Sequence, residues 1–278
     1  MPYAKNGDLD IYYETFGEGE PLVLIMGLGA DGPVWEAHRE FYKEKFKCIA
    51  IDNRGVGKSS KPEGSYTSDE MASDVVAVMD DLGVKQARVA GISMGGIIAQ
   101  SLALNNPDRV HSLVLISTWA KCDLYAKTVF ENFKIMRAHS TLDRFMECLQ
   151  LWIFATKFWT ENPDAIKEGQ TMVNGNPTPQ PQYGFEAQCD ACTSHDSSAR
   201  LGEIKVPTLI TVGTRDIFTP LAFSEELHAG IKGSKMIVYP DTGHAHHWEV
   251  LEQFNNDTRK TGCATVILNG TLVKVVPY

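Results

Sequence analysis

The sequence has few cysteines, no excess of positive charge and no long apolar run. Its 278 residues include six scattered cysteines, which is typical of a reducing compartment rather than of a disulfide scaffold. The formal net charge of −9 argues against nucleic acid or an anionic membrane as a partner. No apolar stretch approaches the ~20 residues that span a bilayer, and the first residues show no secretory leader pattern. These absences predict a cytoplasmic globular protein without membrane or nucleic-acid partners.

One close cysteine pair, Cys189 and Cys192, raises the question of a redox or metal site. Such a site would need a second pair or a strand-to-helix setting, and the sequence offers neither. His244 and His246 could form a two-residue metal pair, but no third ligand is evident. We therefore interpret the cysteines as small apolar residues on a helix and expect no cofactor.

A Gly-x-Ser-x-Gly pentapeptide, Gly91 to Gly95, lies between a short apolar run and a run with helical periodicity. Residues 86–92 suit a strand buried in a parallel sheet, and residues 94–104 predict a helix that Pro107 terminates. The glycines are predicted to allow a backbone turn too sharp for residues with side chains, which exposes the Ser93 hydroxyl. The start of the helix favours an anion there. Ser93 is thus a candidate nucleophile.

Short apolar runs alternate with helical periodicity up to Thr118. The strand candidates are 9–16, 22–26, 48–52, 88–92 and 113–117. Between 48–52 and 88–92, a capping box of Thr67 and Glu70 and a terminal Gly83 predict a helix. This alternation predicts an α/β fold, in which helices cover both faces of a mostly parallel sheet.

The pattern changes between residues 119 and 202, which contain no convincing strand. This segment is rich in aromatics and methionine and predicts several short helices, interrupted by a proline-rich loop at 176–181. We interpret it as an inserted helical cap. Strands are predicted again at 206–213 and 236–239.

Two further helices are expected after the cap. Thr219 and Pro220 predict the N-cap and first residue of one helix, and another begins near His247. The polar residues 256–260 are expected to end that last helix.

The tail is rich in β-branched residues, and Asn269-Gly270 is a favoured hairpin turn. The hairpin could pair with a second copy of the chain, giving a homo-oligomer, or lack fixed structure, or be foreign to the natural chain, and the sequence leaves these alternatives open. The expected domains are a core of 1–118 and 203–258, a helical cap of 119–202 and a C-terminal extension of 259–278.

A serine nucleophile needs a base and an acid that orients the base. In a parallel sheet both must lie after strands, at the edge where Ser93 emerges. Asp216 follows the strand at 206–213, and His244 follows the strand at 236–239. Asp216 and His244 are therefore the candidate acid and base, and Asp123 and Asp241 are the alternative acids.

The order Ser93, Asp216, His244 resembles that of the α/β-hydrolases, in particular the group of 3-oxoadipate enol-lactonases and cofactor-free haloperoxidases. The resemblance covers about residues 8–256. It also rests on the loop Asp52 to Ser59. Further shared residues are His195-Asp196 and Arg200-Leu201, which precede the predicted strand that bears Val206-Pro207. It implies an α/β-hydrolase fold with about eight strands and an inserted cap.

The resemblance also implies an oxyanion hole formed by two backbone N–H groups. Met94 follows the nucleophile, and Leu28 lies in Met26-Gly27-Leu28-Gly29, where the family commonly has His-Gly-x-Gly. The change from histidine to Met26 removes a side chain that would brace the loop but removes no backbone donor. Together these residues predict acyl transfer from a small-molecule ester or lactone through an acyl-enzyme.

The acyl group is less well defined by the sequence. Leu28, Met94, Trp119 and Trp152 predict an apolar pocket wall. A carboxylated substrate would require a cation there, and the candidates are Lys121, Arg137 and Arg144. Three alternative functions remain open: perhydrolysis or acyl transfer, carbon-carbon bond hydrolysis with the same triad, and non-catalytic binding of a small molecule.

Overall fold

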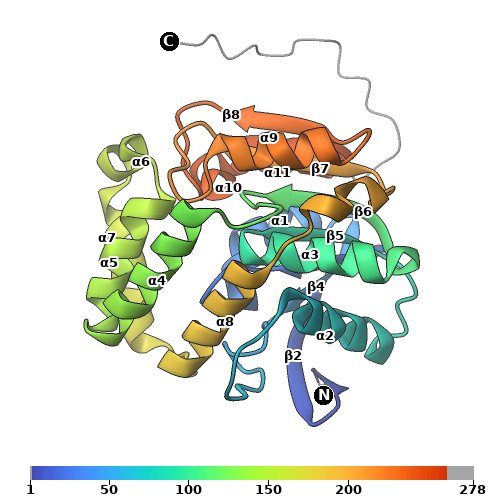
Figure 1. The fold of residues 1–278 in the computed structure, drawn as a ribbon, viewed down its shortest axis with the longest axis horizontal. Helices are drawn as coiled ribbons and strands as arrows, with labels where there is room; N and C mark the ends of the chain where they lie inside the picture. Colours follow the sequence, from blue (N-terminus) through green and yellow to red (C-terminus); the bar gives the residue numbers. More distant parts are fainter. Residues whose placement is uncertain (1, 262–278) are drawn as a thin grey trace.

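An eight-stranded sheet organises the chain in the computed structural model, which describes residues 2–261 (Figure 1). The predicted C-terminal hairpin lies outside the described residues. The strands are β1 (Tyr3–Asn6), β2 (Leu9–Phe16), β3 (Glu20–Ile25), β4 (Phe46–Ile51), β5 (Ala87–Ile92), β6 (Val110–Ile116), β7 (Thr208–Gly213) and β8 (Lys235–Tyr239). Their order is β1-β2-β4-β3-β5-β6-β7-β8, and every pair from β4 onward is parallel. The predicted mostly parallel sheet is confirmed.

Alternation along the strands gives the sheet two apolar faces. In β3, Val23 and Ile25 belong to one core cluster, whereas Leu22 and Leu24 belong to the other. Both faces are buried because parallel strands connect through helices that lie over the sheet.

The helices outside the cap cover both faces. They are α1 (Glu36–Tyr42), α2 (Ser68–Asp81), α3 (Met94–Asn105), α9 (Leu221–Gly230), α10 (His246–Glu249) and α11 (Leu251–Thr261), with the short 3-10 helices η1 (Gly32–Trp35) and η2 (Pro107–Arg109). α2, α3 and α9 contribute to one core cluster, and α1 and α11 to the other. The predicted capping box of Thr67 and Glu70 is present, and Gly83 adopts φ +65° just after α2.

Five α-helices and the 3-10 helices η3 (Val173–Gly175) and η4 (Ser198–Glu203) lie between β6 and β7, and the α-helices gather beside one end of the sheet (Figure 1). They are α4 (Leu124–Ala138), α5 (Leu142–Ile153), α6 (Thr156–Glu161), α7 (Pro163–Met172) and α8 (Gln182–Ser194), and we call them the cap helices. Cys189 and Cys192 are buried on α8, where burial raises the pKa of both thiols. None of the helices within residues 2–261 combines the length and the apolar character that a membrane span requires.

Two helix boundaries differ from the predictions. α11 continues to Thr261 through the polar residues that were expected to end it. Those residues make specific contacts, because Tyr239 Oη donates to Asp257 Oδ2 at 3.2 Å and Arg259 pairs with Glu44 at 3.2 Å. The predicted boundary of an extension at residue 259 therefore falls inside a helix. The start of α9 is the second difference, and its cause lies in the candidate site.

Several histidines are buried between the sheet and its covering helices. The rings of His38 and His247 stack with centroids 5.4 Å apart, and His38 Nδ1 lies 2.7 Å from Asn255 Oδ1. Burial lowers the pKa of His38 to about 4 and that of His246 to about 3. These imidazoles are neutral in the folded protein at neutral pH.

We therefore expect stability to fall as the pH drops below about 6.5, the ordinary histidine value. The unfolded chain then binds protons that the folded protein excludes, at a cost of about 1.4 kcal/mol per pH unit for each histidine. Urea midpoints between pH 7 and pH 5 measure this slope. His38→Gln should reduce the slope, whereas His228→Gln, at an exposed position, should leave it unchanged. An identical slope in His38→Gln and the parent would contradict this account.

Candidate active site

Ser93 occupies the corner between β5 and α3 in a strained conformation, with φ 52° and ψ −116°. Such a backbone costs about 1–3 kcal/mol in a residue with a side chain, so the surrounding structure must enforce it. Ser93 N donates to Ile116 O at 2.8 Å, and Thr118 Oγ1 donates to Ser93 O at 2.8 Å. One contact comes from the last residue of the neighbouring strand β6 and the other from the second residue after it.

The glycines on either side of Ser93 are required for space. A Cβ at Gly91 would collide with the carbonyl of Gly95, and a Cβ at Gly95 would collide with the carbonyl of Ile25. Neither glycine has positive φ, whereas Ser93 does. The positive φ is therefore at Ser93 itself, and the predicted role of the glycines is confirmed, because they leave room for a corner too tight for residues with side chains.

Asp216 and His244 meet at the ends of β7 and β8. His244 Nδ1 lies 2.9 Å from Asp216 Oδ2. Asp216 Oδ1 accepts hydrogen bonds from the backbone N–H groups of Phe218 and Thr219 at 3.0 and 2.7 Å. Burial alone would raise the pKa of the Asp216 carboxyl, but the His244 imidazole and the Thr219 hydrogen bonds hold it below its usual range. Asp216 is thus a buried carboxylate aimed at His244.

Thr219 takes part in this contact rather than capping α9 as predicted. Its Oγ1 donates to Asp216 Oδ2 at 2.7 Å and lies 3.0 Å from His244 Nδ1. Pro220 occupies the N-cap position, and α9 begins one residue later than expected. The sequence does not distinguish a helix cap from the contact of Thr219 with Asp216 and His244, because both need a hydroxyl just before a helix.

The loop that carries His244 is tied to the same edge of the sheet as Ser93. Ser117 Oγ donates to His244 O at 2.9 Å and lies 3.2 Å from His246 Nδ1. His246 Nε2 lies 3.0 Å from Thr211 Oγ1. Adjacent residues, Ser117 and Thr118, therefore hold the backbones of His244 and Ser93.

The described hydrogen bonds do not include one between Ser93 Oγ and His244 Nε2. His244 uses Nδ1 alone, toward Asp216 and Thr219. Catalytic serine–histidine contacts are often loose without substrate and tighten in the complex. The arrangement is compatible with proton transfer from Ser93 to His244.

The alternative acids lie elsewhere. Asp123 caps α4, where its Oδ1 accepts a hydrogen bond from Ala126 N at 2.8 Å. Asp241 is exposed and pairs with Arg215 at 3.3 Å. Neither forms a described contact with His244.

The Met26–Gly29 loop lies against Ser93. A Cβ built on Gly27 would lie 3.2 Å from Ser93 Cβ and 3.8 Å from its Oγ. Gly27 O accepts a hydrogen bond from Ala30 N at 3.3 Å, which closes a turn. Leu28 and Met94, the predicted oxyanion donors, therefore lie on the two backbone segments that border Ser93.

Aromatic rings connect His244 to the cap helices. The ring of Phe218, a residue that sequence reasoning missed, has its centre 4.8 Å from that of the His244 ring and 5.3 Å from that of the Phe133 ring. Phe133 in turn lies 5.8 Å from Trp152, one of the predicted wall residues, which is half-buried. The other, Trp119, is fully buried and packs on Phe130.

Of the three candidate cations, only Arg137 lacks a carboxylate partner. Lys121 pairs with Asp196 at 2.6 Å and Arg144 pairs with Glu147 at 2.6 Å. Every other arginine among the described residues forms an ion pair. Arg137 instead donates to Gln180 O at 2.6 Å and lies over Phe185, 4.8 Å from the ring centre. Burial lowers the pKa of its guanidinium.

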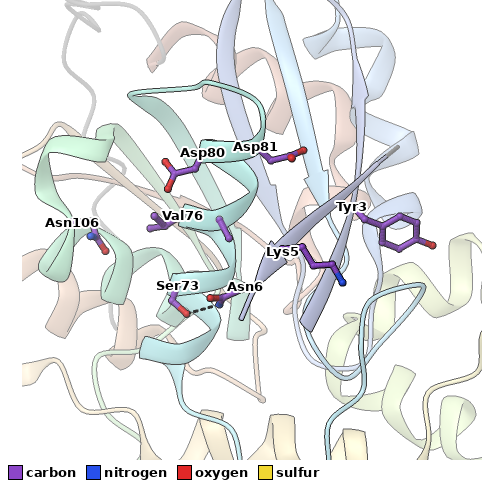
Figure 2. A pocket seen from close by; sticks show the side chains of 9 residues that line it. Tyr3, Lys5, Asn6, Ser73, Val76, Asp80, Asp81 and Asn106 are labelled. Atoms are coloured by element: carbon purple, nitrogen blue, oxygen red, sulfur yellow. Dashed lines mark hydrogen bonds between the residues drawn. The ribbon is translucent and has the colours of Figure 1, made fainter. Parts of the chain in front are cut away.

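An open surface hollow of about 550 Å³ lies elsewhere, between β1 and α2 (Figure 2). Its lining includes Asn106, just beyond the C-terminal end of α3. Ser93 precedes the other end of this helix, and its length of twelve residues separates the two by about 18 Å. The hollow is therefore distinct from the candidate active site.

Comparison with known proteins places these features in context. Residues 20–140 match the family model described as the alpha/beta hydrolase fold. The chain is 32% identical to RutD of Azorhizobium caulinodans, provisionally named a carbamate hydrolase, over 92% of this chain and 96% of the relative. It is 28% identical to 3-oxoadipate enol-lactonase 2 of Acinetobacter baylyi, over 90% and 91%. A thermophilic esterase from Thermogutta terrifontis superposes with a TM-score of 0.81 at 27% identity, over 91% and 92%.

Proposed function

Because this chain belongs to the α/β-hydrolase family, we propose that it is a serine hydrolase that cleaves carboxylic esters or lactones through an acyl-enzyme on Ser93. One observation carries the proposal. The strained Ser93 corner and the 2.9 Å contact between His244 and the buried Asp216 lie at the same edge of the sheet. This is the order and arrangement of a nucleophile, a base and an orienting acid.

In the first half-reaction, His244 Nε2 takes the proton from Ser93 Oγ while that oxygen attacks the substrate carbonyl carbon. The carbonyl oxygen becomes an anion and accepts hydrogen bonds from the N–H groups of Leu28 and Met94. Asp216 stabilises the imidazolium through Nδ1. His244 then protonates the leaving alkoxide, and the carbon-oxygen bond to it breaks.

In the second half-reaction, water attacks the acyl-enzyme after His244 takes its proton. The carboxylic acid leaves when the bond to Ser93 Oγ breaks and His244 returns the proton to that oxygen. The N-terminus of α3, directly after Ser93, favours the negative charge in both steps.

Two relatives support ester and lactone substrates, since one is named an enol-lactonase and another an esterase. A second candidate is carbamate hydrolysis, which the most extensively matched of the cited relatives favours. It uses the same attack on a carbonyl carbon, but either an amine leaves in the first half-reaction, or an alkoxide leaves and water then releases a carbamic acid from the carbamoyl-enzyme.

Turnover across aryl esters of increasing chain length, several lactones and simple carbamates tests the proposed function. We expect ester or lactone turnover well above the carbamate rates. Carbamate turnover that exceeds both would favour the second candidate, and no turnover of any of the three classes would contradict the proposal. Added hydrogen peroxide or a second alcohol in the same assay measures transfer of the acyl group to acceptors other than water.

Arg137→Met adds a test of the acyl group. The Arg137 guanidinium lies over the Phe185 ring, and that ring lies 3.7 Å from the position of a Cβ on Gly29. The Phe185 ring therefore separates Arg137 from the loop beside Ser93. A charge-assisted hydrogen bond contributes about 1.5–3 kcal/mol. We expect Arg137→Met to lower kcat/KM at least tenfold for esters with a carboxylate on the acyl chain, and to spare neutral esters. Arg144→Met is the control, and equal effects on both substrate classes would contradict the prediction.

A further inference from the structure

The turn that presents Leu28 to Ser93 has a defined geometry. Gly29, its third residue, has φ +73°, a conformation that glycine adopts without strain. The Gly27–Leu28 peptide is planar, and Ala30 N binds its carbonyl oxygen. The Leu28 N–H therefore points away from the closed side of the turn, and its direction depends on how the turn, residues 27–30, is held.

Two side chains from distant parts of the sequence hold this turn. Asn53 Nδ2 donates to Met26 O at 3.0 Å, and Gly29 N donates to Gln188 Oε1 at 3.0 Å. Gln188 lies on the cap helix α8, 159 residues further along the chain. The brace that Met26 cannot supply thus comes from the core loop on one side and from the cap on the other.

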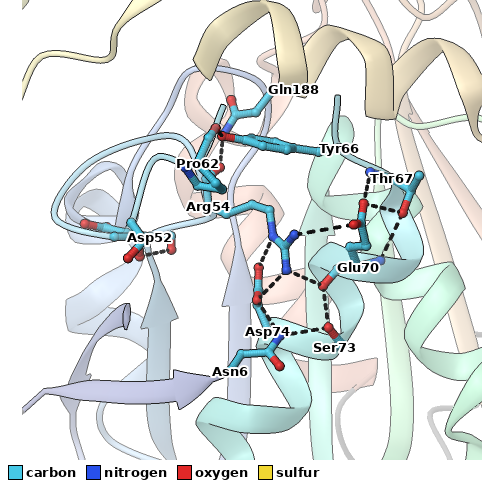
Figure 3. A network of polar contacts seen from close by, with 12 residues as sticks. Asn6, Asp52, Arg54, Pro62, Tyr66, Thr67, Glu70, Ser73, Asp74 and Gln188 are labelled. Atoms are coloured by element: carbon cyan, nitrogen blue, oxygen red, sulfur yellow. Dashed lines mark hydrogen bonds and ion pairs between the residues drawn. The ribbon is translucent and has the colours of Figure 1, made fainter. Parts of the chain in front are cut away.

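The Gln188 side chain is fully buried and its hydrogen bonds fix its orientation. Its Nε2 donates to Arg54 O at 2.8 Å, and its Oε1 also accepts from Gln180 Nε2 at 3.0 Å. If the amide were reversed, its NH2 group would face the Gly29 N–H, so that two donors would meet. Its oxygen would face Arg54 O, so that two acceptors would meet. Figure 3 shows Gln188 reaching down from α8 to the loop that contains Arg54.

Arg54 gives Gln188 a rigid anchor. Its Nε donates to Asp74 Oδ2 at 2.7 Å within a buried ion pair, and its Nη2 donates to Glu70 O at 3.1 Å (Figure 3). Asp74 and Glu70 both belong to α2, which packs on the sheet. Gln188 therefore spans from the turn beside Ser93 to a fixed point of the core.

We propose that Gln188 is a positioning residue that couples the cap to catalysis: by binding Gly29 N it sets the direction of the Leu28 N–H toward the oxyanion. The proposal rests on the proposed function, since it concerns the same acyl transfer. Displacement of a catalytic group by about 1 Å can cost on the order of 100-fold in rate. Loss of one oxyanion donor costs about 10²-fold to 10³-fold.

The test replaces Gln188 by Met, which is similar in length and makes none of its three side-chain hydrogen bonds. Gln150→Met is the matched control. Gln150 is also a buried glutamine of the cap, and its Nε2 donates to Ile166 O at 3.0 Å within the cap helices. Both variants lose buried hydrogen bonds, so both should lower the urea midpoint. Only Gln188→Met should change the chemistry.

For Gln188→Met we expect kcat on an aryl ester to fall 10- to 100-fold while KM stays within about twofold, because the oxyanion contact forms in the transition state. A trifluoromethyl ketone, which adds to the serine as a tetrahedral anion, should bind more weakly by the same factor. Gln150→Met should match the parent in both measurements. Should Gln188→Met not fold, Gln188→Asn, whose shorter amide cannot span Gly29 N and Arg54 O, takes its place.

Equal kcat in the Gln188 and Gln150 variants, or a loss confined to KM, would overturn the proposal. This outcome is distinguishable from failure of the proposed function. If the parent hydrolyses esters and Ser93→Ala does not, the acyl-enzyme mechanism stands whatever Gln188 does. If the parent hydrolyses no ester, lactone or carbamate, both proposals fall together.

Discussion

Ser93→Ala should lower kcat for ester hydrolysis by at least about 10⁴-fold. Without Oγ no acyl-enzyme can form, and what remains is the attack of water assisted by the oxyanion donors, which in other serine hydrolases is weaker by several orders of magnitude. The backbone contacts of Ser93 with Ile116 and Thr118 do not involve Oγ, so the variant should fold normally. Steady-state hydrolysis of an aryl ester, with a urea midpoint for each protein, measures both effects.

Ser224→Ala is the matched control. Ser224 is also a buried serine, within the core helix α9, and among the described residues its Oγ has no hydrogen-bond partner. Its removal should leave kcat unchanged. If Ser93→Ala kept more than a few per cent of the parent activity, with both variants folded, Ser93 would not be the nucleophile.

Asp216→Asn should lower kcat by about 10⁴-fold with little change in KM. The backbone N–H groups of Phe218 and Thr219 both donate to Oδ1, so the amide oxygen takes that position and the NH2 group faces His244. His244 Nδ1 must then accept a hydrogen bond, which moves the imidazole proton to Nε2. An Nε2 that carries a proton cannot take one from Ser93.

The same substitution at Asp241 separates this effect from a loss of charge. Asp241 is exposed and pairs with Arg215 across the surface, so Asp241→Asn should retain full activity. Steady-state kinetics of the two variants at one pH is sufficient. Comparable losses in both, or an active Asp216→Asn, would assign the orienting acid to another residue.

Seven of the eight strands and most helices could be predicted because each is encoded locally, whereas the short β1 (Tyr3–Asn6) was not among the candidates. The apolar run before Ser93, the capping box of Thr67 and the strand before Asp216 lie within a few residues of what they determine. The parallel sheet then brings the residues after its strands to one edge, which is why Asp216 and His244 could be paired from the sequence.

The residues that sequence reasoning missed depend on tertiary contacts. Gln188 meets Gly29 across 159 positions, and Ser117 meets His244 across 127. No local pattern marks either residue, since each has an ordinary side chain within a regular context. The sequence predicts Thr219 as a helix cap, whereas its hydroxyl donates to Asp216, because a helix cap and a carboxylate contact use the same group.

The end of α11 was missed for a related reason. The polarity of residues 256–260 predicts a stop, but Asp257, Thr258 and Arg259 find partners on β8, α1 and the loop after α1. Contacts of this kind stabilise a polar helical turn that its own composition would not.

The central claim is that Ser93 carries the acyl group, and a fluorophosphonate tests it most directly. The reagent is expected to modify the parent protein once, on the peptide that contains Ser93, with loss of ester hydrolysis in proportion to labelling and no labelling of Ser93→Ala. Mass spectrometry of the intact protein and of its peptides gives the answer. Full activity after complete reaction with Ser93, or an adduct on another residue that accounts for the inactivation, would contradict the claim.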